Sequence, residues 1–289
     1  MKHSKGENIF NIFNIAFMAL LALITLYPFW HVLMTSVMTY SELLKSNIRL
    51  FTLKPDFSAY AYIFSNESLL NGLNISVITT IAGTAYQLFM TGTLAFALSK
   101  PDLPGRKFML FFVIFTMFFG GGLIPYYLLI KNLGLIDNLL VLVVPGAIST
   151  YNLIIVKTFF ENIPKDLEES AIIDGAGYIR VFFWIIIPLS LPIIATIGLF
   201  SAVGQWNNWF TSMLYLNKKS SWPLALVLRD MLINDPAQSK GSSAVNKAFM
   251  LGESIKMAVV IVSVVPVMVI YPFVQKYFVK GVMLGSVKS

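Results

Sequence analysis

Six long apolar stretches, separated by polar segments, set the pattern of this chain. An α-helix needs about 20 mainly apolar residues to cross about 30 Å of hydrocarbon, and each stretch is at least that long. The stretches are Ile9–Val37, Leu70–Leu98, Phe108–Ile130, Leu139–Phe160, Leu189–Trp209 and Ser254–Tyr277. Because these lengths suit helices and not strands, the pattern predicts an all-α integral membrane protein with about six transmembrane helices, forming one domain over residues 1–289. The first stretch shows no cleavage pattern after a short apolar core, so we expect a retained span.

Helix-breaking residues fall inside several of the predicted spans. Pro28, Pro125, Pro145 and Pro266 lie within them. Membrane helices tolerate proline where neighbouring groups satisfy the freed carbonyls, so kinks are expected. The run Gly120–Gly122 in the third span suits either a flexible joint or a face for close helix packing, and we favour packing.

Composition supports a membrane protein and removes several kinds of chemistry. Of the 289 residues, 57% are hydrophobic and 12% are charged, with a mean hydropathy of +0.75, whereas soluble domains are about 25% charged. The chain contains no cysteine and two histidines, which excludes disulfides and cysteine nucleophiles and leaves little for a metal centre. We therefore predict no catalytic residues, no metal site and no cofactor bound by this chain.

The distribution of basic residues indicates how the chain lies in the membrane. The formal net charge is +7, but the basic residues are scattered among polar gaps and form no stripe, which argues against nucleic acid as a partner. Short loops rich in Lys and Arg face the cytoplasm, and the gap Ser99–Lys107 holds three basic residues. This places both termini, residues 161–188 and a tail at 277–289 in the cytoplasm. Residues 210–253 become an extracytoplasmic loop.

The loop at residues 161–188 has an unusual composition. It carries five of the fourteen acidic residues of the chain, namely Glu161, Asp166, Glu168, Glu169 and Asp174. Pro164 suits a first helical position, and Asp166 with Glu169 resembles a capping box. Gly175 and Gly177 suit a helix end, after which Tyr178–Trp184 resumes a helical pattern. The loop predicts two short helices joined by a sharp turn, which suit either docking into a groove of a partner or an ordinary solvated loop.

The spacing of this loop resembles the EAA signature of ABC importer permeases. That signature reads Glu-Ala-Ala, three residues, Gly, nine residues and Ile-x-Leu-Pro. The chain reads Glu169-Ser-Ala171, three residues, Gly175, nine residues and Ile185-Ile-Ile187-Pro188, so Ser170 and Ile187 are the two departures. The resemblance implies coupling helices that sit in a cleft of a cytoplasmic ATPase. The residues that we assign to ATPase coupling are Glu168, Glu169, Ala171, Asp174, Gly175, Ala176 and Gly177.

Further segments are similar to one branch of that family. Phe96–Lys107, Gly120–Pro125, Leu133–Leu135 and Tyr271–Gly281 resemble the carbohydrate importers related to the maltose permease second subunit, and within them the LplC/YtcP polysaccharide-fragment (oligosaccharide) permeases. The resemblance implies a type I ABC importer permease fold in a bacterial cytoplasmic membrane. It implies a heterodimer with a homologous second permease, two copies of an ABC ATPase and an extracytoplasmic solute-binding protein. The tail Lys280–Ser289 is expected to reach into the ATPase dimer.

The mechanism implied by this resemblance is import of a carbohydrate, with an oligosaccharide expected, by ATP-driven alternating access. The chain contains no Gly-x-x-x-x-Gly-Lys-Ser/Thr loop, so ATP and Mg are expected on the partner ATPase and this chain is not expected to be an enzyme. Polar residues within spans tend to face cavities or partners, and aromatic faces suit sugars. The substrate-path candidates are Gln205, Trp206, Asn207, Asn208, Trp209, Tyr151 and Asn152. For Trp206 and Trp209 an interfacial belt is the alternative.

Three other functions compete with this prediction. An ABC permease for a non-sugar solute such as a peptide would share the coupling motif. An ion-driven secondary transporter would place acidic residues in its spans, but the central portions of the six stretches hold no Asp or Glu. A membrane-bound enzyme would need clustered His, Cys or acidic residues at membrane depth. We also expect the extracytoplasmic segment Leu216–Glu253 to meet the binding protein.

Overall fold

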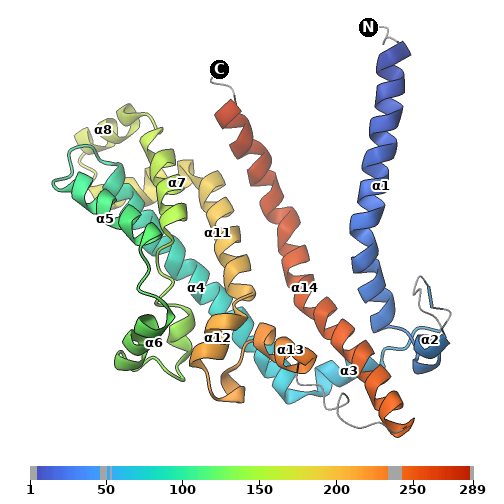
Figure 1. Ribbon diagram of the computed structural model, residues 1–289. Helices are drawn as coiled ribbons and strands as arrows, with labels where there is room; N and C mark the ends of the chain where they lie inside the picture. The colour runs from blue at the N-terminus through green and yellow to red at the C-terminus, as the bar shows by residue number, and fades with distance from the viewer. Residues whose placement is uncertain (1–4, 46–50, 53, 234–242, 287–289) are drawn as a thin grey trace. The chain divides into compact units, whose positions relative to one another are not determined.

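The computed structural model describes residues 5–45, 51–52, 54–233 and 243–286, and the regular structure within these ranges is entirely helical (Figure 1). Residues 234–242 of the predicted extracytoplasmic loop, including Lys240, and residues 287–289 of the predicted tail lie outside the described residues. The longer helices are α1 (Lys5–Ser36), α4 (Glu67–Ser99), α5 (Arg106–Phe118), α6 (Leu123–Asn132), α7 (Thr150–Glu161), α11 (Leu191–Trp206), α13 (Leu224–Ile233) and α14 (Ser243–Ser286). The shorter ones are α2 (Tyr40–Lys45), α3 (Ser58–Ser65), η1 (Leu139–Leu142), α8 (Lys165–Ile173), α9 (Tyr178–Val181), η2 (Phe182–Ile186), α10 (Ile187–Leu189), α12 (Trp209–Tyr215) and η3 (Lys219–Ser221).

Three helices are long and apolar enough to cross a membrane without a break. They are Ile9–Ser36 in α1, Glu67–Ser99, which is α4, and Gly252–Pro272 in α14. Two further pairs of helices pass the same test only when the pair is taken together. The chain bends by 116° between α5 and α6, and by 84° between the Tyr178–Leu189 segment and α11. The all-helical membrane class is confirmed; by length and composition, the described residues contain three unbroken candidate spans, or up to five if each bent pair is one span.

The third predicted span breaks at its glycines. Helix α5 ends at Phe118, and Gly122 adopts a left-handed φ of +83° immediately before α6. A side chain at Gly120 or Gly121 would meet nothing within 4 Å, so the run makes no close helix packing within the described residues. Within the described residues the run therefore forms a bend, and close packing of these glycines against another subunit stays a prediction.

The fourth predicted span is interrupted by polar caps. The side chain of Asn138 caps η1 by accepting from Leu140 N at 3.0 Å. The side chain of Ser149 caps α7 by accepting from Asn152 N at 3.5 Å. Pro145 lies in the non-helical segment between them. With 12 residues, α7 is about 18 Å long and is shorter than the hydrocarbon thickness.

The chain divides into two compact units, which we describe separately. The first comprises Met1–Leu70 and Leu228–Val265. In it, the hydroxyls of Ser36 and Tyr60 lie 2.8 Å apart, and Glu42 Oε2 accepts a hydrogen bond from Thr52 Oγ1 at 2.7 Å. None of the most apolar window of α1 is buried, so this helix presents apolar side chains all round, as a helix in lipid or against a partner subunit does.

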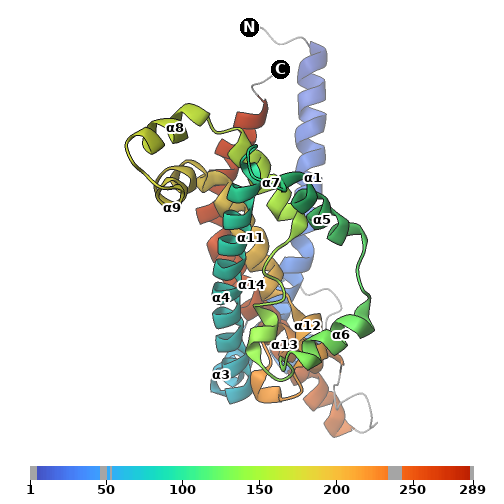
Figure 2. The ribbon, with the colours of Figure 1, turned by 90° about the vertical axis from the view of Figure 1, so that its left-hand side faces the viewer.

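The second unit comprises Asn71–Val227 and Pro266–Ser289 and has two apolar clusters. The first joins α4, α7, the α9–η2 segment and α11, with Leu98, Leu153, Val181 and Ile197 at its centre. The second joins α6, η1 and α12 through Ile130, Val141, Leu142, Tyr215 and Leu216. In Figures 1 and 2, α8 and α9 lie at one end of this unit, next to the first cluster, and α6 and α12 lie at the other end. The first cluster therefore supports the acidic loop.

Candidate functional site

The acidic loop folds as two short helices with a tight turn between them. Helix α8 begins at Lys165, and Pro164 occupies the flanking position with no side-chain cap. The expected capping box is therefore absent, and Asp166 lies in the first turn, where a carboxylate interacts favourably with the helix dipole. The second helix starts at Tyr178 and continues through η2 into α10, as the sequence predicts.

The turn after α8 depends on one glycine. Ala176 N donates to Ala171 O at 2.9 Å, and Gly175 N donates to Ile172 O at 3.0 Å, which is the hydrogen-bond pair of a Schellman motif. That motif places Gly175 at φ +84°, a conformation that is cheap only for glycine. Gly177, by contrast, has φ −75° and precedes α9, so the two glycines have different roles.

Small side chains on α8 and in the turn face the apolar cluster. Ala171 and Ala176 are half-buried and pack against the cluster that includes Leu98, Phe160 and Val181. Their size lets the turn lie close to the ends of α4 and α7. Ala171 and Ala176 thus hold the loop in place, and other residues form its outer surface.

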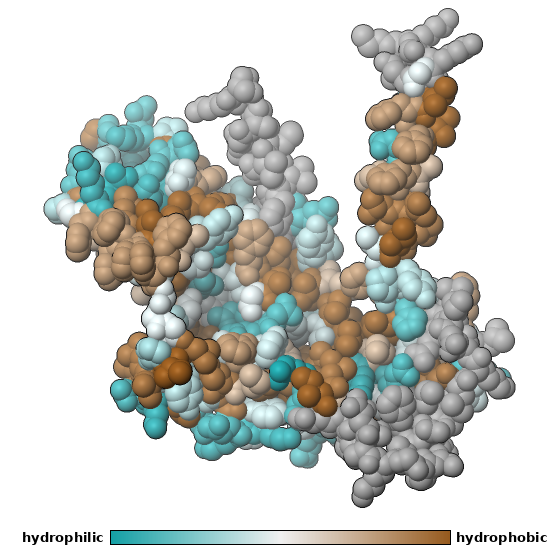
Figure 3. Space-filling view, viewed as in Figure 1, coloured by the Kyte–Doolittle hydropathy of each residue, from teal (hydrophilic) through white to brown (hydrophobic). Residues whose placement is uncertain are grey.

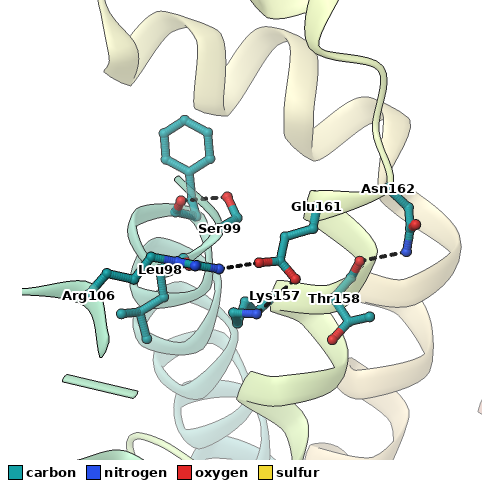
Figure 4. A network of polar contacts seen from close by, with 8 residues as sticks. Leu98, Ser99, Arg106, Lys157, Thr158, Glu161 and Asn162 are labelled. Carbon is teal, nitrogen blue, oxygen red and sulfur yellow. Dashed lines mark hydrogen bonds and ion pairs between the residues drawn. The ribbon is translucent and has the colours of Figure 1, made fainter. Parts of the chain in front are cut away.

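Ion pairs fasten the loop to its neighbours. Lys100, directly after α4, pairs with Glu168 of α8, and their side chains are 26% and 16% exposed. Arg106 pairs with Glu161 at the end of α7 and donates to Leu98 O at 2.8 Å (Figure 4). Lys157 Nζ lies 2.8 Å from the same Glu161 carboxylate. Glu168 is therefore engaged within the chain instead of standing free for a partner.

The outer surface of the loop combines acidic and apolar side chains. Glu169 and Asp174 are exposed, and so are Ile173, Tyr178 and Ile179, which are 85%, 64% and 77% exposed. In Figure 3, polar surface gathers over α8, and apolar surface dominates over α5 beneath it. We call Glu169, Ile173, Asp174, Tyr178 and Ile179 the docking surface, because exposed apolar groups beside charges are typical of a contact site.

Most of the predicted substrate-path residues serve local structure. Asn207 Nδ2 donates to Val203 O at 2.9 Å, and Asn208 Oδ1 accepts from Thr211 N at 3.3 Å as the cap of α12. Trp206 is buried, and Trp209 meets Phe210 edge to face at 5.6 Å. The polar cluster thus coincides with a helix break, and a substrate contact of its residues stays a prediction; Gln205 has the further environment described next.

Gln205 lies against α4 at a glycine. A Cβ on Gly83 would come within 2.6 Å of Gln205 Nε2, so the glycine makes room for this side chain. Gln205 Oε1 is buried without a hydrogen-bond partner, as are the hydroxyls of Thr80 and Thr84 on α4 and of Ser201 one turn before Gln205. We call these residues the α4–α11 seam. Sequence reasoning missed its α4 side, although paired threonines around a glycine in an apolar helix were a readable signal.

The other two candidates lie on α7. Tyr151 is exposed and Asn152 is buried, in the first turn after the Ser149 cap. Within the described residues, no hydrogen bond or ring contact joins either residue to the α4–α11 seam. Among those residues there is also no group of three or more His, Cys, Asp or Glu side chains that could hold a metal ion.

The opposite end of this unit is held by one carboxylate. Asp137, at φ +57°, accepts from Asn217 N at 2.6 Å and from Lys218 N at 3.2 Å. Its own amide donates to Tyr215 O at 2.9 Å. The backbone hydrogen bond from Asn217, followed by the one from the Asn217 side chain, lowers the pKa of Asp137 from its ordinary value of 3.8.

Together, the fold and this loop define a helical integral membrane protein with an ordered helix–turn–helix at one polar end. The family of binding-protein-dependent transport system inner membrane components matches residues 106–284. The chain belongs to this family, whose members are permease subunits of ABC importers, and it lies in the membrane.

Two relatives and a solved structure match between 91% and 100% of this chain. It is 42% identical over 289 residues to protein LplC of Bacillus subtilis, covering all of this chain and 98% of LplC. It is 45% identical over 263 residues to the polygalacturonan/rhamnogalacturonan transport system permease protein YtcP of the same organism, covering 91% and 92% of the two chains. A chain in the crystal structure of a bacterial ABC transporter involved in the import of the acidic polysaccharide alginate matches with a TM-score of 0.87 and 30% identity, over 96% of this chain and 99% of that one. This last match shows the type I ABC importer permease fold.

Proposed function

We propose that this chain imports a carbohydrate, in the form of an oligosaccharide, as one membrane subunit of a binding-protein-dependent ABC importer. The observation that carries the proposal is the α8–α9 loop. An ion pair and an apolar cluster hold the loop in place, while its docking surface is exposed. A solvated loop does not need Ile173 and Ile179 at 85% and 77% exposure. An ATPase that covers them gains the burial of both side chains.

The loop defines the orientation of the chain in this proposal. The docking surface lies in the cytoplasm, together with both termini and the basic residues Lys100, Arg106 and Lys107 near the start of α5. Asp137 and the segment after α12 then face outward, toward a solute-binding protein. A homologous second permease completes the membrane part, and two ATPase copies bind ATP and Mg.

The substrate class rests on the relatives. The name of YtcP refers to polygalacturonan and rhamnogalacturonan, and the neighbouring crystal structure belongs to an importer of alginate. The α4–α11 seam supplies buried amide and hydroxyl groups without partners, which suit the hydroxyls of a sugar or the water that accompanies it. In this proposal Gln205 lines the path when α4 and α11 separate.

The test is reconstitution of the chain with its second permease, ATPase and binding protein in proteoliposomes. Uptake and ATP hydrolysis are measured with neutral oligosaccharides, acidic oligosaccharides and short peptides. The proposal expects saccharide-stimulated hydrolysis and uptake, both lost in Glu169→Lys, which reverses a charge on the docking surface. Stimulation by peptides instead of saccharides would overturn the substrate class. Uptake by this chain alone, driven by an ion gradient, would overturn the proposal that it works as a subunit of an ATP-driven importer.

A further inference from the structure

Lys100 occupies a position between two parts of the proposed coupling machinery. It follows the last residue of α4, and its ammonium pairs with Glu168 of α8. The same ammonium lies 4.2 Å from the centre of the Phe96 ring, one turn back on α4. A cation held by a carboxylate and by an aromatic face gains from both interactions.

The second short helix is tied to the same point. Phe96 and Phe182 have ring centroids 5.2 Å apart, and Phe182 is the first residue of η2, directly after α9. Both halves of the loop therefore contact the last turn of α4, α8 through the Lys100–Glu168 pair and α9–η2 through Phe182. The end of α4 and the docking surface form one connected body.

Helix α4 runs from this body to the α4–α11 seam without a break. It is a single helix of 33 residues, and Gly83 lies 17 residues before Lys100, about 25 Å along the axis at 1.5 Å per residue. Sharp kinks in helices arise mainly at proline, and no proline lies between Gly83 and Lys100, so this part of α4 is expected to move as one rigid helix. A push on α8 therefore reaches the Gly83–Gln205 contact through α4.

We propose that Lys100 is a positioning residue for ATPase coupling: it fastens α8 to the end of α4, so that movement of the docking surface moves α4 against α11. This inference rests on the proposed function. It makes Glu168 an internal attachment and leaves Glu169 to contact the partner. The seam, with its unpartnered amide and hydroxyl groups, is the place where this movement opens a polar surface.

The first test separates positioning from assembly in the complete transporter. The variants are Lys100→Met, Glu168→Gln and the exchange Lys100→Glu with Glu168→Lys. The control is Lys107→Met, because Lys107 is exposed at the start of α5 and makes no ion pair with a described residue. The amount of complex with ATPase is measured first, and then saccharide uptake per ATP hydrolysed.

The expected result is normal assembly with a roughly tenfold lower uptake per ATP in the two single variants, within the range of measured coupling energies. The exchanged pair recovers most of the wild-type ratio, and Lys107→Met is unchanged. Wild-type ratios in both single variants would overturn the inference, and so would a loss of assembly in step with the loss of uptake. Absence of ATPase association in the wild type would instead overturn the proposed function.

A distance measurement in the complete transporter tests the attachment of α8 to α4 independently of uptake. The chain contains no cysteine, so Asp102→Cys and Lys165→Cys supply its two thiols for spin labels, one beside α4 and one at the start of α8. The distance between them is expected to stay constant between the nucleotide-free and ATP-bound states of the wild type. The distribution of distances is expected to broaden in Lys100→Met. A wild-type distance that changes with nucleotide would show that α8 moves independently of α4 and would refute the attachment.

Discussion

The two ends of the second unit are ordered by different interactions. At the α8 end, charged side chains from separate elements pair with one another, as Lys100 does with Glu168 and Arg106 with Glu161. At the α6–α12 end, the single Asp137 carboxylate accepts backbone hydrogen bonds next to an apolar cluster. Both ends connect distant parts of the chain, the first through pairs of long side chains and the second through a carboxylate and backbone amides.

This difference indicates what each end can do. Pairs between long side chains hold two helices together while their exposed faces remain available to a partner. Hydrogen bonds to backbone amides fix the path of a loop and leave it little freedom. The α8 end is therefore suited to pass on a displacement, and the α6–α12 end to present a fixed surface. The following variants test this contrast.

The largest effect is expected at the turn of the α8 end. Gly175→Val places a β-branched residue at φ +84°, a conformation that costs about 1–3 kcal/mol. The docking surface is then displaced, and ATPase association measured by co-purification falls about tenfold. The control is Gly177→Val at φ −75° with nothing within 4 Å, and it is expected to bind normally. Equal loss in both variants would remove the special role of Gly175.

The next effect lies between the two ends, at the α4–α11 seam. In Gly83→Ala the new Cβ lies 2.6 Å from Gln205 Nε2, so the flexible Gln205 side chain must turn aside, at a cost near the lower end of the range of about 1–3 kcal/mol for an overpacked site. The thermal midpoint of the purified complex is expected to fall. In Gly204→Ala the added Cβ meets nothing within 4 Å, and the midpoint should hold or rise. A neutral Gly83→Ala would mean that the seam is loosely packed.

A smaller effect is expected from the second ion pair of the α8 end. Arg106→Met removes the pair with Glu161 and the hydrogen bond to Leu98 O. Lys157 remains beside Glu161, so the loss is limited to about 1 kcal/mol. Unfolding of the purified chain in detergent is the measurement, with Lys107→Met as the neighbouring control. A larger loss of unfolding free energy in Lys107→Met than in Arg106→Met would show that Lys107, and not Arg106, supplies the stabilising charge.

The smallest effect is expected at the opposite end and depends on pH. Because hydrogen bonds lower the pKa of Asp137 from 3.8, its contribution to stability is present above 3.8 and is lost as the pH falls through the lowered value. Amide exchange of Asn217 and Lys218 at neutral pH should be faster in Asp137→Asn than in the wild type. The difference should still be present at pH 3.8, where the lowered pKa leaves Asp137 ionised, and it should vanish at lower pH, once the pH has fallen through the lowered pKa. A difference that persists after Asp137 is protonated would exclude its ionisation as the cause.

The contrast between the ends also shows which features of the structure can be predicted from the sequence. The membrane class follows from the lengths of the apolar stretches, and the turn at Gly175 follows from its spacing behind Glu169. Both depend on short-range patterns. Apolar length does not reveal the direction of the backbone, so the sequence offers the 116° bend at Gly120–Gly122 only as the less favoured joint, and it does not predict the interruption before α7.

Long-range pairing was not predictable from one sequence. Lys100 and Glu168 are 68 residues apart, and Asp137 and Asn217 are 80 apart; no local pattern links such residues. In the polar run at Gln205–Trp209, Asn207 and Asn208 form local hydrogen bonds at a helix break, and a substrate contact of this run stays a prediction. The sequence alone does not distinguish an asparagine that caps a helix from one that faces a cavity.

The most direct test of the account is photo-crosslinking from each end of the second unit in the assembled transporter. A photoreactive residue replaces Ile173, which is 85% exposed on the docking surface, and in a second variant it replaces Lys131, which is exposed at the end of α6. The account predicts that the ATPase is captured from position 173 and not from position 131. Capture of the ATPase from position 131, or its absence from position 173 in a complex that hydrolyses ATP, would contradict it.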